Sequence, residues 1–255
     1  MNLFLPKNIF SQLIVHSISE ASNLNISFSA SSLLTKSLLL NTNSVSFIPI
    51  FDLLDHNDLF VSKKYGICFD EQLCNSYLYF GEGVNQIEKL FLRGDISKNE
   101  VILSKIMMKE LYELDVELSI DANNELNNSD NYLIVGDENF SNKKFISNAI
   151  SFSETIEEYI SAPYVNYLLA STDKKQLQLC EEILSRSATE IYSNIDELLT
   201  NSYSDLQSEV KDNIREGIGS FIYNLNEADI EGINELLRIP FLHGTIKDIV
   251  VPNFV

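Results

Sequence analysis

The residues with the clearest chemical potential are two acids, Asp137 and Glu138, which follow a short apolar run through Gly136. The run Tyr132–Val135 is rich in strand-forming residues and has the length of a buried strand. Glycine permits a tight turn and the close approach of another backbone. Because ligands of open α/β sheets bind beyond the carboxyl ends of the strands, we predict that Asp137 contacts a ligand. The alternative is that Asp137 only caps the following turn.

Further polar residues stand beside the end of an expected strand or at the start of an expected helix. These candidates are Lys7, Asn8, Ser76, Ser97, Lys98 and Asn99. Helix starts carry free backbone N–H groups and the positive end of the helix dipole, so they suit a carboxylate even without an arginine. The alternatives stay open: Ser97 as a helix cap alone, and Ser76 and the asparagines as solvent or turn residues.

No nucleophile–base set and no metal pattern is recognisable. The three histidines have no neighbouring serine or cysteine motif of the elbow type. There is no glycine-rich phosphate loop, and no pair of His or Cys residues has metal-ligand spacing, so we expect no metal site. Cys68, Cys74 and Cys180 are odd in number and are expected to be reduced thiols of a cytosolic protein.

Composition excludes some classes of partner. The chain has 255 residues, 45% of them hydrophobic, which is enough for one large core or two modest ones. A net charge of −19, from 37 acids against 18 bases, argues against nucleic acid and against an anionic membrane surface. It argues only weakly against an anionic substrate, since salt screens the global field. No signal peptide and no membrane-spanning apolar run is recognisable, so we predict a cytoplasmic protein.

Short apolar runs alternate with amphipathic stretches through most of the chain, which favours parallel sheets with helices on both faces. The expected strands are Asn2–Leu5, Asn25–Ser29, Ser44–Ile48, Phe60–Phe69, Ser76–Phe80, Glu88–Leu92, Val116–Ile120, Tyr132–Val135, Ile146–Ile150 and Tyr164–Ala170. The expected helices in this part are Asn8–Ala21, Ser31–Leu40, Ser97–Glu113 and Ser151–Ile160, with Ser31 as a cap and Ser97 with Glu100 as a capping box.

We predict a two-lobed α/β fold with a helical C-terminal segment. Residues 84–165 form an inserted lobe, and residues 1–83 with 166–255 form the other. The chain is expected to cross between the lobes at Gly81–Gly83 and at Ala162–Ser171. From Thr172 onward the pattern is purely helical, and Pro240 is expected to end the last helix.

Three segments together resemble one family. They are Ser44–Leu54 (SVSFIPIFDLL), Leu133–Asn139 (LIVGDEN) and Phe221–Leu236. Each is similar to a segment of the futalosine-pathway menaquinone enzymes, chorismate dehydratase and the related 1,4-dihydroxy-6-naphthoate synthase. The resemblance follows the family in order along nearly the whole chain, and the Gly-Asp-Glu turn is its most distinctive part.

The resemblance implies the two-lobed fold of type II periplasmic binding proteins and a cytoplasmic carbon–oxygen lyase. Such an enzyme removes water from chorismate, a small anionic metabolite, and gives 3-enolpyruvylbenzoate. No metal or organic cofactor is implied. The oligomeric state is left open, with a homodimer as one candidate.

The site loops depart from the family pattern. Asn75 and Lys98 stand where the family has arginines, and Asn8 matches the family's asparagine only with a shift of one residue. Ser76, Ser97 and Asp137 match. These departures motivate an alternative function, a non-catalytic protein that binds a small carboxylate ligand on the same fold. A secreted transporter component is a third and weaker reading.

If the chain acts on chorismate, the resemblance implies roles for the loop residues. Lys7 or Lys98 would offset one substrate carboxylate, and Ser97 with the start of its helix would bind the other. Asn8 would be the catalytic residue that orients the leaving hydroxyl or the enolpyruvyl group. Asn99 and Asp137 would complete the substrate-binding set, and no residue is identified as the general base.

Overall fold

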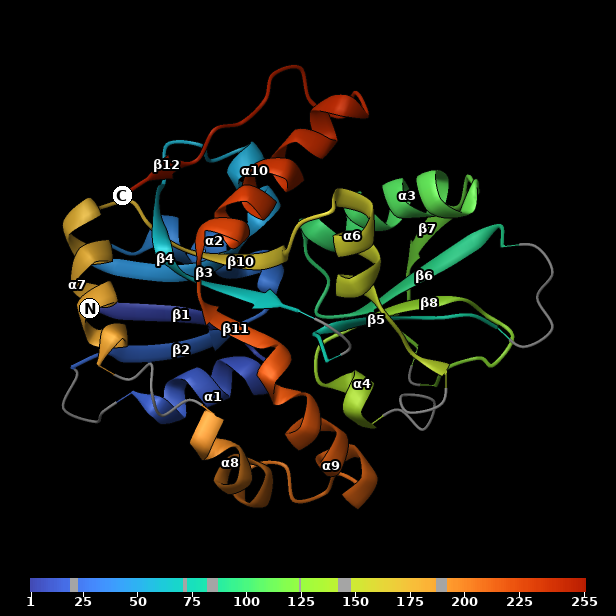
Figure 1. Cartoon of the computed structure of the whole chain (residues 1–255), viewed down its shortest axis with the longest axis horizontal. Helices are drawn as coiled ribbons and strands as arrows, with labels where there is room; N and C mark the ends of the chain where they lie inside the picture. The colour runs from blue at the N-terminus through green and yellow to red at the C-terminus, as the bar shows by residue number, and fades with distance from the viewer. Residues whose placement is uncertain (19–22, 71–72, 82–86, 124, 142–147, 187–191) are drawn as a thin grey trace.

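The computed structural model describes residues 1–18, 23–70, 73–81, 87–123, 125–141, 148–186 and 192–255. Within them the chain forms two lobes, each built on its own β-sheet, and both termini lie on the same lobe (Figure 1). The predicted two-lobed α/β architecture is therefore confirmed.

The first lobe holds the larger sheet. Its strands are β1 (Asn2–Pro6), β2 (Asn25–Ser29), β3 (Ser44–Pro49), β4 (Phe60–Phe69), β10 (Tyr164–Ser171), β11 (Phe221–Asn224) and β12 (Asn253–Phe254). Their order is β11-β4-β10-β3-β1-β2, with β12 paired to β4. Strands β1, β2 and β3 are parallel, and β10 runs antiparallel between β3 and β4. Every residue of β3 and β10 is buried, as expected of strands covered on both faces.

The second lobe holds a smaller sheet. Its strands are β5 (Ser76–Tyr79), β6 (Lys89–Gly94), β7 (Glu117–Ile120), β8 (Tyr132–Val135) and β9 (Ile150–Ser151), in the order β7-β6-β8-β5-β9. Strands β6, β7 and β8 are parallel, whereas β5 is antiparallel to β8 and β9. The two sheets thus share one arrangement. In each, the first parallel strand lies between the second and the third, and an antiparallel strand follows the third.

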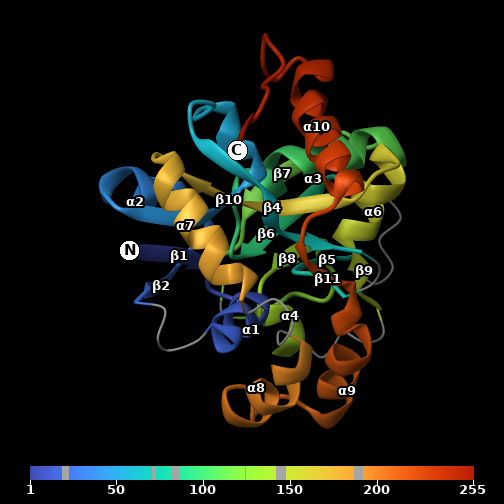
Figure 2. The same cartoon turned by 60° about the vertical axis from the view of Figure 1, so that its left-hand side comes forward.

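Helices cover the sheets and fill the base of the molecule. The described helices are α1 (Ile9–Ser17), α2 (Leu34–Leu40), α3 (Lys98–Tyr112), α4 (Glu138–Ser141), α6 (Phe152–Ile160), α7 (Lys174–Ser185), α8 (Ile195–Asn201), α9 (Ser208–Gly217) and α10 (Glu227–Leu242). Short 3-10 turns are η2 (Ser31–Leu33), η3 (Ile50–Leu54), η4 (Tyr192–Asn194) and η5 (Ile218–Ser220). Helix α7 lies against β3, β4 and β10, while α10 contacts β10. Helices α8 and α9 lie together below α1 and α4 in both views (Figures 1 and 2).

Apolar side chains join the two lobes as well as filling them. One buried cluster contains Phe10 of the first lobe and Phe140 of the second, whose ring centroids lie 6.2 Å apart. Another contains Ile50 of the first lobe together with Leu103 of the second. The lobes are therefore in direct contact, and polar contacts between them lie beside apolar surfaces from which water is excluded.

The first crossing between the lobes differs from the prediction. Strand β5 pairs with β8 and β9, so the chain leaves the first sheet after Phe69 and enters the second at Ser76. Gly81 follows β5 within the second lobe, and residue 83 lies outside the described residues. An aromatic strand can join either sheet, which is why the sequence pattern did not distinguish them. We propose that the inserted lobe begins near Ser76 rather than at residue 84.

The C-terminal segment is helical except for two strands that the sequence analysis missed. The four residues of β11 pair with β4 at an edge of the first sheet, and β12 pairs with the same strand. Pro240 does not end the last helix, because α10 continues to Leu242. The first helix ends at Ser17, where Ile18 turns to an extended conformation, and does not run to Ala21 as expected. Of the expected strand Ile146–Ile150, Ile150 belongs to β9 (Ile150–Ser151), and residues 146 and 147 lie outside the described residues.

Candidate functional site

Strands β1, β2 and β3 each lead to a backbone N–H that donates to a side chain of the second lobe. The three donor–acceptor pairs, with their N···O distances, are Ile9 with Asp137 (2.8 Å), Ser31 with Asp95 (2.7 Å) and Phe51 with Asn99 (3.0 Å). We call these six residues the boundary site. Because it lies at the carboxyl ends of parallel strands, it has the position in which α/β sheets bind ligands.

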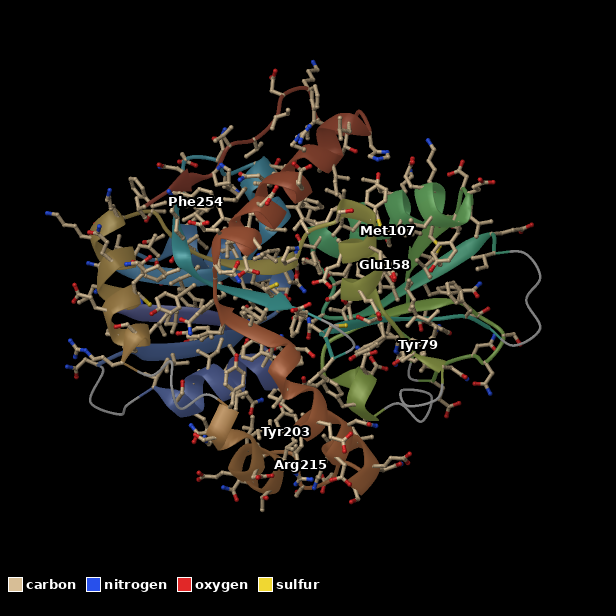
Figure 3. All side chains as sticks on the ribbon, in the orientation of Figure 1. Tyr79, Met107, Glu158, Tyr203, Arg215 and Phe254 are labelled. Carbon is tan, nitrogen blue, oxygen red and sulfur yellow. The ribbon has the colours of Figure 1, made fainter. Side chains whose placement is uncertain are left out.

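Asp137 is held by two donors of the first lobe. Its Oδ1 accepts the Ile9 N–H, and its Oδ2 accepts the hydroxyl of Tyr203 at 2.7 Å. Gln12 in turn donates its side-chain amide to the Tyr203 oxygen at 2.8 Å. Tyr203 lies on the segment between α8 and α9, below the boundary of the lobes (Figure 3). The carboxylate of Asp137 therefore reaches across to the first lobe instead of capping its own turn.

Burial controls the protonation of these two groups. It raises the pKa of Asp137, the hydrogen bonds from Tyr203 and Ile9 oppose that change, and nearby Asp95 adds to it while Lys7 lowers it. Burial and the adjacent carboxylate also raise the pKa of Tyr203, so its hydroxyl stays protonated and donates.

Asp95 is held in the same manner by one residue. Its Oδ1 accepts the Ser31 N–H, and its Oδ2 accepts the Ser31 hydroxyl at 2.6 Å. The Ser31 oxygen also lies 2.7 Å from the Tyr167 hydroxyl. Burial raises the pKa of Asp95, and the two Ser31 donors oppose that rise. Each of the two acids is thus bound by one N–H and one hydroxyl, and no basic side chain of the described residues is in hydrogen-bond contact with either.

Asn99 makes the third contact and is fully buried. Its Oδ1 accepts the Phe51 N–H, while its Nδ2 donates to the backbone and side-chain oxygens of Asn166, both at 2.8 Å. Three bonds of one amide therefore connect α3 with η3 and β10. This geometry assigns Asn99 a role in joining the lobes.

Two glycine turns place the acids of the second lobe. Gly94 ends β6 and precedes Asp95, and Gly136 follows β8 and precedes Asp137. Their φ angles are +88° and +91°, in the left-handed region that glycine adopts without a steric cost. A Cβ on Gly94 would collide with the Val135 carbonyl, so no other residue fits there. A Cβ on Gly136 would lie 3.6 Å from the Asp95 Cβ, which puts the two acidic turns side by side.

The structure places three predicted site residues next to the boundary site. Asn8 precedes Ile9 and caps α1, with its Oδ1 accepting the Ser11 N–H at 2.9 Å. Its Nδ2 is buried and has no partner among the described residues, and the same holds for the Ser76 hydroxyl and both amide atoms of Asn75. Lys7 is exposed. These groups are available to bond a ligand.

The remaining predicted residues serve their own helix or the surface. Ser97 forms the predicted capping box of α3, and Oε2 of Glu100 accepts its N–H and its hydroxyl at 2.8 and 2.6 Å. Glu100 is completely buried, which raises its pKa, and its Oε1 has no partner in the described part of the chain. Lys98 forms an ion pair with Asp55. Ser97 and Lys98 are therefore engaged within the protein in this state.

A pocket of about 440 Å³ opens beside the boundary site and is lined from both lobes. Its lining residues are Ser32, Thr35, Lys36, Leu39, Leu40, Asp52, His56 and Lys98. Asp52 accepts the Thr35 hydroxyl at 2.5 Å, and burial raises its pKa. The lining combines Lys36, Lys98 and His56 with the carboxyl of Asp52, and Lys98 is already paired with Asp55.

Sequence reasoning missed the partners of Asp137 and the second acid. Asp95 was identifiable, because it follows a strand and a glycine just as Asp137 does. Ser31 was expected only as a helix cap, but its hydroxyl bonds Asp95 and no side-chain cap is formed there. Tyr203 carries no local signal, since it lies between two helices and meets Asp137 only in the folded chain.

Other kinds of site find no support in the described ranges. Within them, no group of three or more His, Cys, Asp or Glu side chains is arranged to hold a metal ion. None of their helices is long and apolar enough to cross a membrane.

No protein-family model matches the chain, and no curated protein matches it. Solved structures do resemble it. Protein AF1704 from Archaeoglobus fulgidus superimposes with a TM-score of 0.68 at 12% identity, covering 96% of this chain and 98% of that one. YhfZ from Shigella flexneri gives a TM-score of 0.51 at 10% identity, covering 76% of this chain and 90% of that one. A TctC solute binding protein from Polaromonas gives 0.45 at 9% identity, covering 96% and 98%.

This likeness establishes the fold. Together with the two strand orders, it gives the chain the mixed α/β, two-sheet fold of type II periplasmic-binding-protein-like structures, as the sequence predicts. At such low identity the likeness extends to the fold alone.

Proposed function

We propose that the protein binds a small carboxylate-bearing metabolite at the boundary site. The observation that carries this proposal is the pair of donors, one N–H and one hydroxyl, that the first lobe directs at each of two carboxylates. Such neutral donors hold a carboxylate well in a water-excluded site.

Within this class, we propose dehydration of chorismate as the specific reaction. Two segments that resemble chorismate dehydratase lie at the boundary site: Leu133–Asn139 contains Asp137, and Ser44–Leu54 forms β3 and η3. In this reaction the ring carbon that carries the enolpyruvyl ether loses a proton. Its neighbour loses hydroxide, and the two leave as one water. The electron pair of the broken C–H bond completes the aromatic ring of 3-enolpyruvylbenzoate.

The chain's own residues suggest how each demand of the reaction would be met. The buried Nδ2 of Asn8 is free to bond the leaving hydroxyl, as the resemblance implies. The substrate carboxylates would bind the donors of the first lobe that hold Asp95 and Asp137. Lys7 would offset a substrate carboxylate from the rim. We place this activity in the cytoplasm, as proposed from the sequence.

A turnover assay tests the reaction. Chorismate is incubated with purified protein, and 3-enolpyruvylbenzoate is quantified by liquid chromatography with mass detection against heat-denatured protein. We expect product, with at least a tenfold lower rate for Asn8→Ala by analogy with the loss of one positioned group, which is a rise in the barrier of about 1.4 kcal/mol or more. The matched control is Asp58→Asn, an exposed acid with no partner among the described residues. If correctly folded protein leaves chorismate unchanged, the proposed lyase activity is excluded.

The alternative is binding without turnover, and the state of the predicted loop residues favours it. Ser97 is committed to its capping box, Lys98 to Asp55, and Asn99 to the opposite lobe. A protein of this kind would be stabilised against heat by chorismate or a related acid while leaving it intact. No thermal shift with any of a broad set of carboxylic acids would count against both candidates.

A further inference from the structure

We infer that Asp95 and Asp137 are internal stand-ins for two carboxylates of the ligand, so that the ligand is a dicarboxylate which must displace both acids from the first lobe. This inference rests on the proposed function and names its ligand class. It also names the receiving groups: the N–H and hydroxyl of Ser31 for one carboxylate, and the Ile9 N–H with the Tyr203 hydroxyl for the other.

The two pairs of donors in the first lobe match one another. Ser31 offers N–H and O–H to the two oxygens of Asp95, at 2.7 and 2.6 Å. Ile9 and Tyr203 offer N–H and O–H to the two oxygens of Asp137, at 2.8 and 2.7 Å. A pair of neutral donors aimed at both oxygens of one group is a carboxylate-binding arrangement, whichever molecule carries the carboxylate.

The turns that carry Asp95 and Asp137 lie close to one another. The Gly136 turn lies against Asp95, since a Cβ at Gly136 would be only 3.6 Å from the Asp95 Cβ. The negative charge of Asp95 also raises the pKa of Asp137. Two carboxylate positions this close to one another fit the two ends of a single small molecule rather than two separate ligands.

Two residues next to the segments that hold the acids have buried polar atoms that make no bond within the described part of the chain. They are Asn8, which precedes Ile9, with its Nδ2, and Ser76, which pairs with Val135, with its hydroxyl. Both residues are completely buried. These groups add uncharged donors that a ligand carrying hydroxyl or ether oxygens between its carboxylates would use.

Ligand binding is therefore expected to open this protein rather than to close it. A donor that binds a ligand carboxylate has no remaining capacity for the aspartate, and two carboxylates repel one another in a site of low dielectric constant. The ligand-free protein is therefore the closed form, held by its own acids. A bound dicarboxylate keeps the lobes apart, whereas most two-lobed binders close on their ligand.

The test compares wild type with Asp95→Asn, Asp137→Asn and the double variant, with Asp58→Asn as the control. Asparagine keeps the size of the side chain but loses the negative charge, so its hydrogen bonds to the first lobe are weaker. The probes are isophthalate and chorismate as dicarboxylates and benzoate as a monocarboxylate. Calorimetry gives the affinity, small-angle X-ray scattering gives the radius of gyration, and hydrogen exchange reports the amides of Ile9 and Ser31.

We expect the double variant to bind the dicarboxylates about tenfold more tightly than wild type, since its internal competitor is weakened. Without ligand it should expand and lose amide protection at Ile9 and Ser31, and wild type should expand when isophthalate binds. Benzoate should bind more weakly than isophthalate. The Asp58→Asn control should behave as wild type throughout, and each variant's circular dichroism confirms that it folds.

The outcomes separate the two proposals. Dicarboxylates that bind wild type and the double variant equally, or that contract the protein, overturn this inference and leave the proposed function standing. Failure of every acid to bind any variant overturns the proposed function as well. Unchanged protection of Ile9 and Ser31 in the double variant overturns the internal stand-in whatever the binding data show.

Discussion

The two lobes share a strand arrangement but carry opposite chemistry where they meet. In the first lobe, the ends of β1, β2 and β3 present backbone N–H groups and hydroxyls. In the second lobe, the ends of β6 and β8 present the carboxylates of Asp95 and Asp137 on glycine turns, and α3 presents an asparagine. At these strand ends the first lobe donates and the second accepts, while the Asn99 amide also donates to Asn166 of the first lobe. The lobes meet there through uncharged donors and carboxylates, and the Lys98–Asp55 ion pair adds a basic residue to the contact.

The helix starts of the two lobes differ in the same sense. Helix α3 satisfies its first N–H groups internally through the capping box of Ser97 and Glu100. Helix α1 has the side chain of Asn8 as a cap, yet its Ile9 N–H is left to Asp137. An anion therefore finds free donors in the first lobe only if the second lobe withdraws.

The largest effect is expected where the acceptor surface is shaped. Gly94→Ala forces a Cβ against the Val135 carbonyl at a left-handed φ angle, so we expect the free energy of unfolding to fall by roughly 2–4 kcal/mol. Chemical denaturation measures it. Gly219→Ala is the matched control, because a Cβ there meets no atom within 4 Å and its effect should stay within about 1 kcal/mol. Equal losses for both variants would show that the Gly94 turn is not constrained.

A somewhat smaller loss of stability is expected when Asn99, the uncharged residue of the boundary site's second-lobe side, is removed. Asn99→Ala removes three hydrogen bonds between the lobes and leaves the Phe51 N–H and the Asn166 oxygens buried without their partner. We expect a cost of about 2–3 kcal/mol, measured by urea unfolding. Asn57→Ala is the control, since Asn57 is exposed and its side chain has no hydrogen-bond partner among the described residues. A loss no greater than that of the control would contradict the role of Asn99 in joining the lobes.

The Tyr203 hydroxyl is a single donor of the first lobe whose removal tests its contact with Asp137. Tyr203→Phe deletes the donor to Oδ2 of Asp137 but leaves the Ile9 contact, so we expect a loss of about 1 kcal/mol in stability. The pKa of Asp137 should rise further, because one bond to its charged form is gone. Nuclear magnetic resonance titration of the Asp137 carboxyl carbon measures it, and a lowered pKa would speak against this contact. Tyr192→Phe, whose hydroxyl bonds the Phe221 carbonyl, controls for the loss of a tyrosine hydroxyl.

The smallest effect is the pH dependence of closure. Burial raises the pKa of Asp95 and Asp137 in the folded protein, so the native state binds more protons than the unfolded one in mild acid. Their favourable contribution is complete below the unfolded pKa and is lost as the pH rises through the folded pKa. The charged and titratable groups facing them are Lys7, Glu100, Tyr167, Tyr203 and each other.

We therefore expect the stability of wild type, relative to the Asp95→Asn, Asp137→Asn double variant, to fall as the pH rises from about 4 to about 7. Thermal unfolding across this range measures the difference, and subtraction removes the contribution of every other acid. A difference that grows with pH would show that the folded protein lowers these pKa values instead.

Much of the local structure could be predicted from the sequence, because local patterns encode it. The run Tyr132–Val135 forms the buried strand β8, and Asp137 stands at the boundary of the lobes, where a ligand-contacting residue was expected. Ser97 with Glu100 forms the predicted capping box. In each case the deciding information lies within a few residues.

What could not be predicted depends on contacts between distant segments. Asp137 meets Ile9 across 128 positions and Tyr203 across 66, and no periodicity links them. Strand β5 was assigned to the wrong sheet because its aromatic pattern is equally compatible with both. Strand β11 was read as part of a helix, since its apolar residues continue the spacing of the helix before it.

The place of β10 in the first sheet has a consequence for how the chain acquires its shape during synthesis. This strand separates β3 from β4, and it is made about a hundred residues after them. The larger sheet stays split until Tyr164–Ser171 leaves the ribosome, whereas every strand of the smaller sheet lies within residues 76–151. The smaller sheet can therefore form first. The two parts of the larger sheet, which are made earlier, are joined only when β10 inserts between β3 and β4.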